Sequence, residues 1–153
     1  MRNIIQKPLA ALVLTLIALP ALPVISSPAS TTENSTPTLI IIIDDVGNNG
    51  PLGDRAVALP GPVTLAFLPH TPHAKRLANI AAENNKGIML HAPMANATGA
   101  ALGPGALTQD MTPAELQETL SESLDSIPHV QGVNNHMGSV LTADQTAMSS
   151  IMK

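Results

Sequence analysis

The chain contains 153 residues, and its 7 Lys and Arg residues against 11 Asp and Glu residues give a formal net charge of −4. A weakly acidic chain without a basic run offers no electrostatic basis for binding nucleic acid or an anionic lipid surface. The chain has no cysteine, which excludes a disulfide framework, and one aromatic residue, Phe67, which leaves few rings for stacking on a sugar.

Residues 1–29 have the layout of a secretory signal peptide, with a positive start at Arg2 and Lys7, an apolar stretch and then small residues. A retained membrane anchor is the alternative, but the uninterrupted apolar stretch is shorter than the roughly 20 residues that a spanning helix needs. We therefore expect a periplasmic or secreted protein that meets the membrane only through the signal segment before cleavage. Residues 30–37, rich in Ser, Thr and Pro, are expected to be a flexible linker to a domain over residues 38–153.

The first expected element of the domain is a strand over residues 39–43, a run of Leu and Ile. Because polar residues do not alternate with the apolar ones, the run predicts a strand buried on both faces, as in a parallel sheet covered by helices. Asp44 and Asp45 follow it, at the end of the strand where α/β folds usually keep their sites. Neighbouring side chains of a strand point to opposite faces, so the two carboxylates are expected to have different roles.

The rest of the domain alternates between expected helices and strands. A Thr-Pro-Ala-Glu sequence at residues 112–115 combines a helix cap, a proline at the first position and a glutamate placed for a capping box. Thr142 is the expected cap of the last helix. Strict alternation predicts parallel strands with right-handed crossovers, and four strands make an open sheet or about half of a barrel. The expected elements are a helix over 52–59, a strand over 63–68, a helix over 71–86, a strand over 88–91, a loop over 95–105, a helix over 112–127, a strand over 132–135 and a helix over 141–153.

Polar residues that suit a metal follow three of these strands. His91 ends the third expected strand, His136 follows the fourth, and the aspartate pair follows the first. The carboxyl ends of parallel strands meet at one edge of a sheet, and two imidazoles with a carboxylate suit Zn²⁺ or another divalent first-row metal. Such a metal acidifies its water and polarises a carbonyl, and the second carboxylate is then a candidate general base.

The other histidines have simpler interpretations. His70 and His73 flank the expected start of a helix and suit a solvated cap or loop, and His129 follows a proline that ends a helix and is expected to be exposed. Three further polar residues around His136 keep two interpretations open: they orient its imidazole for metal binding, or they form a turn. These residues are Asn134, Asn135 and Ser139.

Four blocks of sequence, in this order, resemble the divergent polysaccharide deacetylase family, a distant relative of the NodB-type carbohydrate esterases. They are Ile-Asp-Asp-Val-Gly at 43–47, Pro-Val-Thr-Leu-Ala-Phe-Leu-Pro at 62–69, His-Ala-Pro-Met at 91–94 and Gly-Val-Asn-Asn-His-Met-Gly-Ser at 132–139. The resemblance covers residues 38–153. It implies the N-terminal part of a deformed (β/α) barrel with parallel strands, in a secreted or periplasmic bacterial protein.

The resemblance also implies roles for individual residues. Asp44 would be the general base, while Asp45, His91 and His136 would hold a divalent metal, with Zn²⁺ as the first expectation. The reaction would be removal of acetyl groups from a polysaccharide or a cell-envelope glycan. Because family members continue into a later Asp-Ser-Arg-Thr-like block, we expect this chain to be a C-terminally truncated member.

Two alternatives remain at this stage. The chain would keep the deacetylase fold as a non-catalytic periplasmic module that binds a glycan or an envelope protein, or it would hydrolyse some other amide or ester. Nothing in the sequence selects the acyl group.

Overall fold

The structure, a computed structural model, describes residues 37–153. The expected signal peptide and nearly all of the expected linker lie outside the described residues. None of the helices in the described range is long and apolar enough to cross a membrane.

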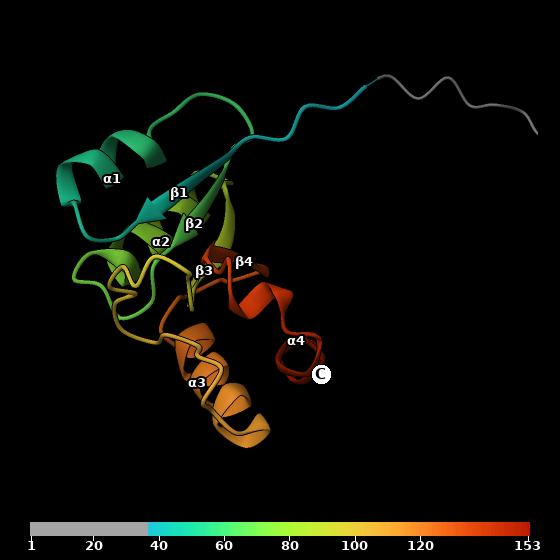
Figure 1. The fold of residues 1–153 in the computed structure, drawn as a ribbon. Helices are drawn as coiled ribbons and strands as arrows, with labels where there is room; N and C mark the ends of the chain where they lie inside the picture. Colours follow the sequence, from blue (N-terminus) through green and yellow to red (C-terminus); the bar gives the residue numbers. More distant parts are fainter. Residues whose placement is uncertain (1–36) are drawn as a thin grey trace, which may run out of the picture. The chain divides into compact units, whose positions relative to one another are not determined.

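The described residues form a four-stranded parallel sheet whose strands alternate with helices, as the sequence predicts (Figure 1). The strands lie in the order β1-β2-β3-β4, so each crossover leads to the neighbouring strand without a reversal. A doubly wound sheet would reverse this order, whereas a (β/α) barrel begins in this way. In chain order the elements are β1 (Ile42–Val46), α1 (Gly50–Val57), β2 (Thr64–Phe67), α2 (Ala74–Glu83), β3 (Gly87–Met94), α3 (Pro113–Asp125), β4 (Gly132–Met137), the 3-10 helix η1 (Leu141–Ala143) and α4 (Gln145–Ile151).

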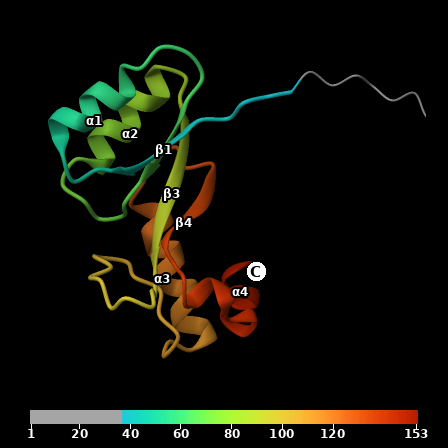
Figure 2. The same ribbon diagram turned by 45° about the horizontal axis from the view of Figure 1, so that its top comes forward.

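The helices pack against the sheet in two pairs. Helices α1 and α2 lie side by side, with α2 against β2 and β3, and α3 packs against β3 and α4 (Figures 1 and 2). The side chains of Leu65, Phe67, Leu77 and Leu90 at the centre of the resulting core are fully buried. Burying an aliphatic or aromatic side chain contributes about 1.5–3 kcal/mol, so this core fixes the sheet on which the polar residues are placed.

Strand β3 is longer than predicted and extends beyond His91 to Met94. Its residues Ile88, Leu90, Ala92 and Met94 belong to the hydrophobic core. Because side chains alternate along a strand, His91 points away from this core, toward the other face of the sheet. The position of the imidazole is therefore set by the core residues on either side of it.

The capping box that opens α3 is formed as predicted. Thr112 Oγ1 accepts a hydrogen bond from the Glu115 backbone N–H at 3.3 Å, and the Thr112 backbone N–H donates to Glu115 Oε2 at 2.7 Å. The second of these bonds favours the ionised carboxylate and lowers the pKa of Glu115 below its usual range. The last expected helix is different, because it divides into η1 and α4, and Asp144 rather than Thr142 caps α4.

The prediction that the first strand is buried on both faces is wrong. In the part of the chain that the structure describes, β1 is an edge strand that pairs only with β2. Leu39 is 84% exposed, Ile40 74% and Ile42 41%. Apolar side chains in this run favour burial, but they are buried only if another element packs on the unpaired side of β1. Residues 37–153 do not supply such an element.

This exposure predicts a contrast between two truncations. Leu65→Ala, in the fully buried centre of β2, should lower the free energy of unfolding by about 2–5 kcal/mol because it leaves a cavity. Ile40→Ala should lower it by less than about 0.5 kcal/mol because its side chain already meets solvent. Urea unfolding of both variants measures the difference. A cost for Ile40→Ala as large as that for Leu65→Ala would mean that another surface covers this edge.

Candidate metal centre

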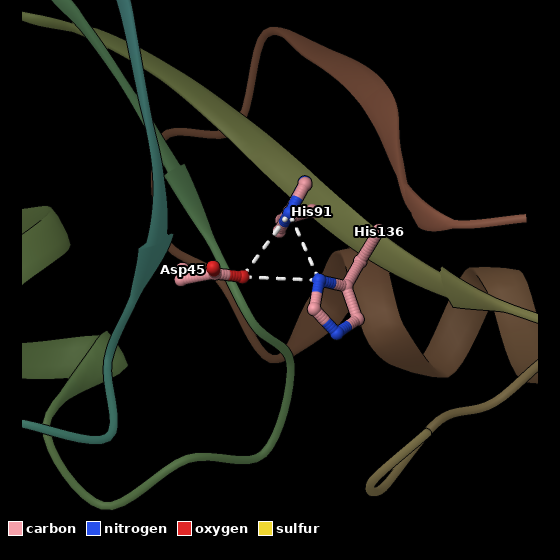
Figure 3. Close-up of side chains that lie close together, drawn as sticks. All are labelled: Asp45, His91 and His136. Carbon is pink, nitrogen blue, oxygen red and sulfur yellow. Dashed lines mark hydrogen bonds and ion pairs between the residues drawn. The ribbon is translucent and has the colours of Figure 1, made fainter. Parts of the chain in front are cut away.

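Three side chains from three strands converge at the carboxyl end of the sheet. Asp45 Oδ1 lies 3.3 Å from His91 Nε2 and 3.0 Å from His136 Nδ1. The two histidine nitrogens are 3.1 Å apart (Figure 3). Each side chain thus offers one possible metal-ligand atom to the same point, and the convergence of Asp45, His91 and His136 at one edge of the sheet agrees with the sequence prediction.

The spacing of these three atoms fits a tetrahedral divalent metal. Bonds of about 2.0–2.1 Å in a tetrahedral site place the ligand atoms about 3.3–3.4 Å apart, close to the 3.0–3.3 Å observed. Two imidazoles and a carboxylate form a ligand set that zinc hydrolases use, and it leaves the fourth position for water or substrate. The three residues therefore fit Zn²⁺ in number, chemistry and distance.

The ligand atoms are enclosed on one side and open on the other. The side chain of His91 is 5% exposed, that of His136 is 18% exposed, and that of Asp45 is 65% exposed. The two rings meet edge to face, with centroids 4.9 Å apart and planes at 68°. The imidazoles therefore form the fixed back of the site, and solvent reaches it from the side of Asp45.

A β-bulge in β1 positions Asp45. Ile43 pairs with Leu65 and Val46 pairs with Phe67, so β1 contains one more residue than β2 over this interval. Asp45 takes up the extra length with a left-handed backbone, at φ 60°. Such a backbone is uncommon for residues other than glycine, and asparagine and aspartate tolerate it best.

The bulge overturns the expectation that the two aspartates point to opposite faces of the sheet. Both carboxylates approach His91, but from its two different ring nitrogens. Asp45 Oδ1 lies near Nε2, whereas Asp44 Oδ1 is 3.8 Å from Nδ1. Asp44 therefore lies beside the three converging atoms and is not one of them.

Asn134 connects Asp44 to His91. Its Oδ1 lies 2.8 Å from His91 Nδ1, and its Nδ2 donates to Asp44 Oδ1 at 2.9 Å. Neither of the two open interpretations holds for this residue, because it lies within β4 and not in a turn, and its side chain contacts His91 and not His136. The sequence signal for this role was the Asn-Asn pair before His136, but the histidine that Asn134 contacts is 43 residues away.

The neighbouring polar residues Asn135 and Ser139 form hydrogen bonds with backbone atoms. Asn135 Nδ2 donates to the Met137 carbonyl at 2.6 Å, and Ser139 Oγ accepts from the Ala97 N–H at 3.0 Å, which ties the loop after β3 to the end of β4. The expected loop role of His70 is confirmed, since it lies in an exposed turn. His73 occupies the cap position of α2, but it is half-buried and its side chain makes no capping hydrogen bond. His129 is exposed, as predicted, and its Nε2 lies 3.1 Å from Asn79 Oδ1.

The fold and the site define the class of this protein: an α/β protein with a candidate metal centre at the carboxyl edge of a parallel sheet. A crystal structure of an uncharacterized protein from Agrobacterium tumefaciens has the same fold, with a TM-score of 0.69 and 25% sequence identity, over 74% of this chain and 47% of that chain. The chain is 30% identical over 115 residues to the uncharacterized protein YibQ of Escherichia coli, covering 75% of this chain and 36% of YibQ. It is also 30% identical over 114 residues to an uncharacterized protein of Haemophilus influenzae, covering 74% of this chain and 41% of that protein.

The sequence model of the divergent polysaccharide deacetylase family matches residues 41–153. The chain belongs to this family, as its sequence blocks indicate. The chain spans less than half the length of the relatives described above.

The bulge gives a direct test of Asp45 as a ligand. Asp45→Asn keeps the side-chain shape and tolerates the left-handed backbone, but it removes the negative charge that a cation needs. We expect the affinity for Zn²⁺ to fall by more than about tenfold, while the free energy of unfolding of the metal-free protein changes by less than about 0.5 kcal/mol. Competition with a chromophoric chelator measures the affinity, and an unchanged affinity would remove Asp45 from the ligand set. Asp45→Ala is a poorer test because it adds backbone strain of about 1–2 kcal/mol.

Proposed function

We propose that the chain acts as an exported, metal-dependent hydrolase that removes acetyl groups from a cell-envelope polysaccharide. The observation that carries the proposal is the convergence of Asp45 Oδ1, His91 Nε2 and His136 Nδ1 within 3.0–3.3 Å of one another. Family membership supports the polysaccharide, and the signal-peptide pattern of residues 1–29 supports a periplasmic or secreted location.

In the proposed chemistry, a metal ion activates the reacting groups and the side chains of the protein hold the ion. A divalent ion, with Zn²⁺ as the first choice, would supply a Lewis acid that polarises an acetyl carbonyl and acidifies water. Asp45, His91 and His136 hold the ion and keep one position open on the exposed side of the site. The negative charge of Asp45 offsets part of the charge of the ion, and the buried imidazoles limit the motion of the site.

Asp44 is the proposed general base. Its side chain is 49% exposed and lies at the edge of the cluster, near the ring of His91. The hydrogen bond from Asn134 to Oδ1 fixes the carboxylate in place. In this position Asp44 is able to take a proton from an attacking water while Asp45 remains with the metal.

The first prediction of this proposal concerns zinc content. The mature chain should bind about one Zn²⁺, and His136→Ala should lose it because one of three protein ligands is removed. His129→Ala is the matched control, since His129 is exposed and lies outside the cluster. Elemental analysis after dialysis, with circular dichroism to confirm folding, gives the result. A folded wild-type chain that binds no zinc would refute the proposed mechanism.

The second prediction concerns the base. Asp44→Asn should lower the rate of acetate release from acetylated glycans by about 100-fold or more, because general-base catalysis contributes at least this much. At saturating zinc this variant should still bind about one Zn²⁺, because Asp44 lies outside the three converging atoms and an asparagine oxygen at position 44 still accepts the hydrogen bond from Asn134. Asp54→Asn is the control: Asp54 lies in α1 and pairs with Arg76 at 2.7 Å. Unchanged acetate release in Asp44→Asn would show that this carboxylate is not the base.

The same assay separates the two functional classes that the sequence leaves open. Zinc binding without acetate release from any glycan would favour the non-catalytic module, in which the site serves to bind a glycan or an envelope protein. The single aromatic residue of the chain gives such a module few rings for stacking on sugars, and for this reason we prefer the hydrolase.

A further inference from the structure

Asn134 belongs to a continuous series of side-chain contacts that runs from the Asp44 carboxylate to the candidate metal centre. Its amide lies between Asp44 Oδ1, at 2.9 Å, and His91 Nδ1, at 2.8 Å. On its other side, His91 presents Nε2 to Asp45 and His136. Each of these four contacts joins side chains that are distant in sequence. The imidazole of His91, at the centre of the series, is 5% exposed.

The chemistry of the amide decides which of its atoms faces which neighbour. An ionised carboxylate only accepts hydrogen bonds, so the NH₂ group of Asn134 must face Asp44. The amide oxygen then faces His91, and because this oxygen only accepts, the imidazole must carry its proton on Nδ1. The charge on Asp44 thus selects the orientation of the amide, and the amide selects the tautomer of the ring.

This tautomer is the one that a metal requires. A neutral imidazole with its proton on Nδ1 has its lone pair on Nε2, which is the atom that lies among the converging donors. With the other tautomer, Nε2–H would donate to Asp45 Oδ1, which lies 3.3 Å away, and the nitrogen that faces the cluster would have no lone pair for a cation. Two tautomers therefore compete at this histidine, and only one of them binds metal.

We propose that Asn134 is a positioning residue that holds His91 in its metal-binding tautomer and, through the same amide, fixes Asp44 beside the metal position. The inference builds on the proposed metal site and deepens it, because it makes the placement of the proposed base and the readiness of one ligand depend on a single side chain. Hydrogen bonds of this kind to the free nitrogen of a ligand histidine typically change metal affinity by about 10–100-fold.

A purely structural role for Asn134 makes a different prediction. If the side chain only fills space in β4, a residue of similar volume should leave the protonation of His91 unchanged. Asn134→Leu keeps the number and branching of the side-chain heavy atoms but can neither donate nor accept a hydrogen bond. Asn134→Asp restores an acceptor for the Nδ1 proton but gives up the donor to Asp44.

The experiment measures the tautomer and the zinc affinity of the same variants. In the metal-free protein at mildly alkaline pH, long-range ¹H–¹⁵N correlation spectra report which nitrogen of His91 carries the proton. We expect the proton on Nδ1 in the wild type and in Asn134→Asp, and a shift toward Nε2–H in Asn134→Leu. Competition with a chelator should show a fall of about 10–100-fold in zinc affinity for Asn134→Leu.

The chain contains a matched control. Asn79 Oδ1 lies 3.1 Å from His129 Nε2, so Asn79→Leu removes the same type of contact from a histidine outside the cluster. This variant should leave the tautomer of His91 and the affinity for zinc as they are in the wild type.

Three results would overturn the inference: a wild-type His91 with its proton on Nε2, an Asn134→Leu variant with wild-type tautomer and affinity, or an Asn134→Asp variant with Nε2–H. The last remains decisive if circular dichroism shows that Asn134→Leu does not fold. A wild-type chain that binds no zinc but shows the expected tautomers would refute the proposed function and leave the positioning role of Asn134 intact.

Discussion

Three atoms with lone pairs are held 3.0–3.3 Å apart at this site, and such atoms repel one another unless a proton or a cation lies between them. The parallel sheet brings the atoms together. Its core of Leu65, Phe67 and Leu90 sets the strands side by side, and the sequential strand order places β1, β3 and β4 with their carboxyl ends at one edge. The stability of the core therefore sets the mutual position of these three atoms.

Local patterns in the sequence were sufficient for the parallel strands and for the polar residues at their ends, namely His91, His136 and the aspartate pair. The choice of Asp45 rather than Asp44 as the ligand came from the family resemblance. The bulge at Asp45 was not predictable, since it depends on how β1 aligns with Leu65 and Phe67 of β2. The bridge through Asn134 was missed for a similar reason. It joins residues 90 and 43 positions apart, and the sequence pattern points to the nearer His136.

The expectation that the first strand is buried failed for a physical reason. A run of Leu and Ile predicts burial, but Leu39 and Ile40 remain largely exposed beside an edge strand. On the opposite side of the sheet, Val133 is 39% exposed, and it lines an apolar hollow of about 200 Å³ together with Leu120 and Ile151. Apolar side chains are thus exposed near both edges of the sheet that residues 37–153 form.

The contacts of Asn134 explain why this position suits an asparagine. An aspartate would accept the His91 proton equally well, but it would bring a third carboxylate close to Asp44 and Asp45 and would leave Asp44 without its donor. A serine hydroxyl can accept and donate, but it is too short to span both the 2.8 Å and the 2.9 Å contacts from the same backbone position. A side-chain amide of this length carries an acceptor and a donor in a fixed plane. It therefore links a carboxylate that must stay charged to an imidazole that must stay neutral.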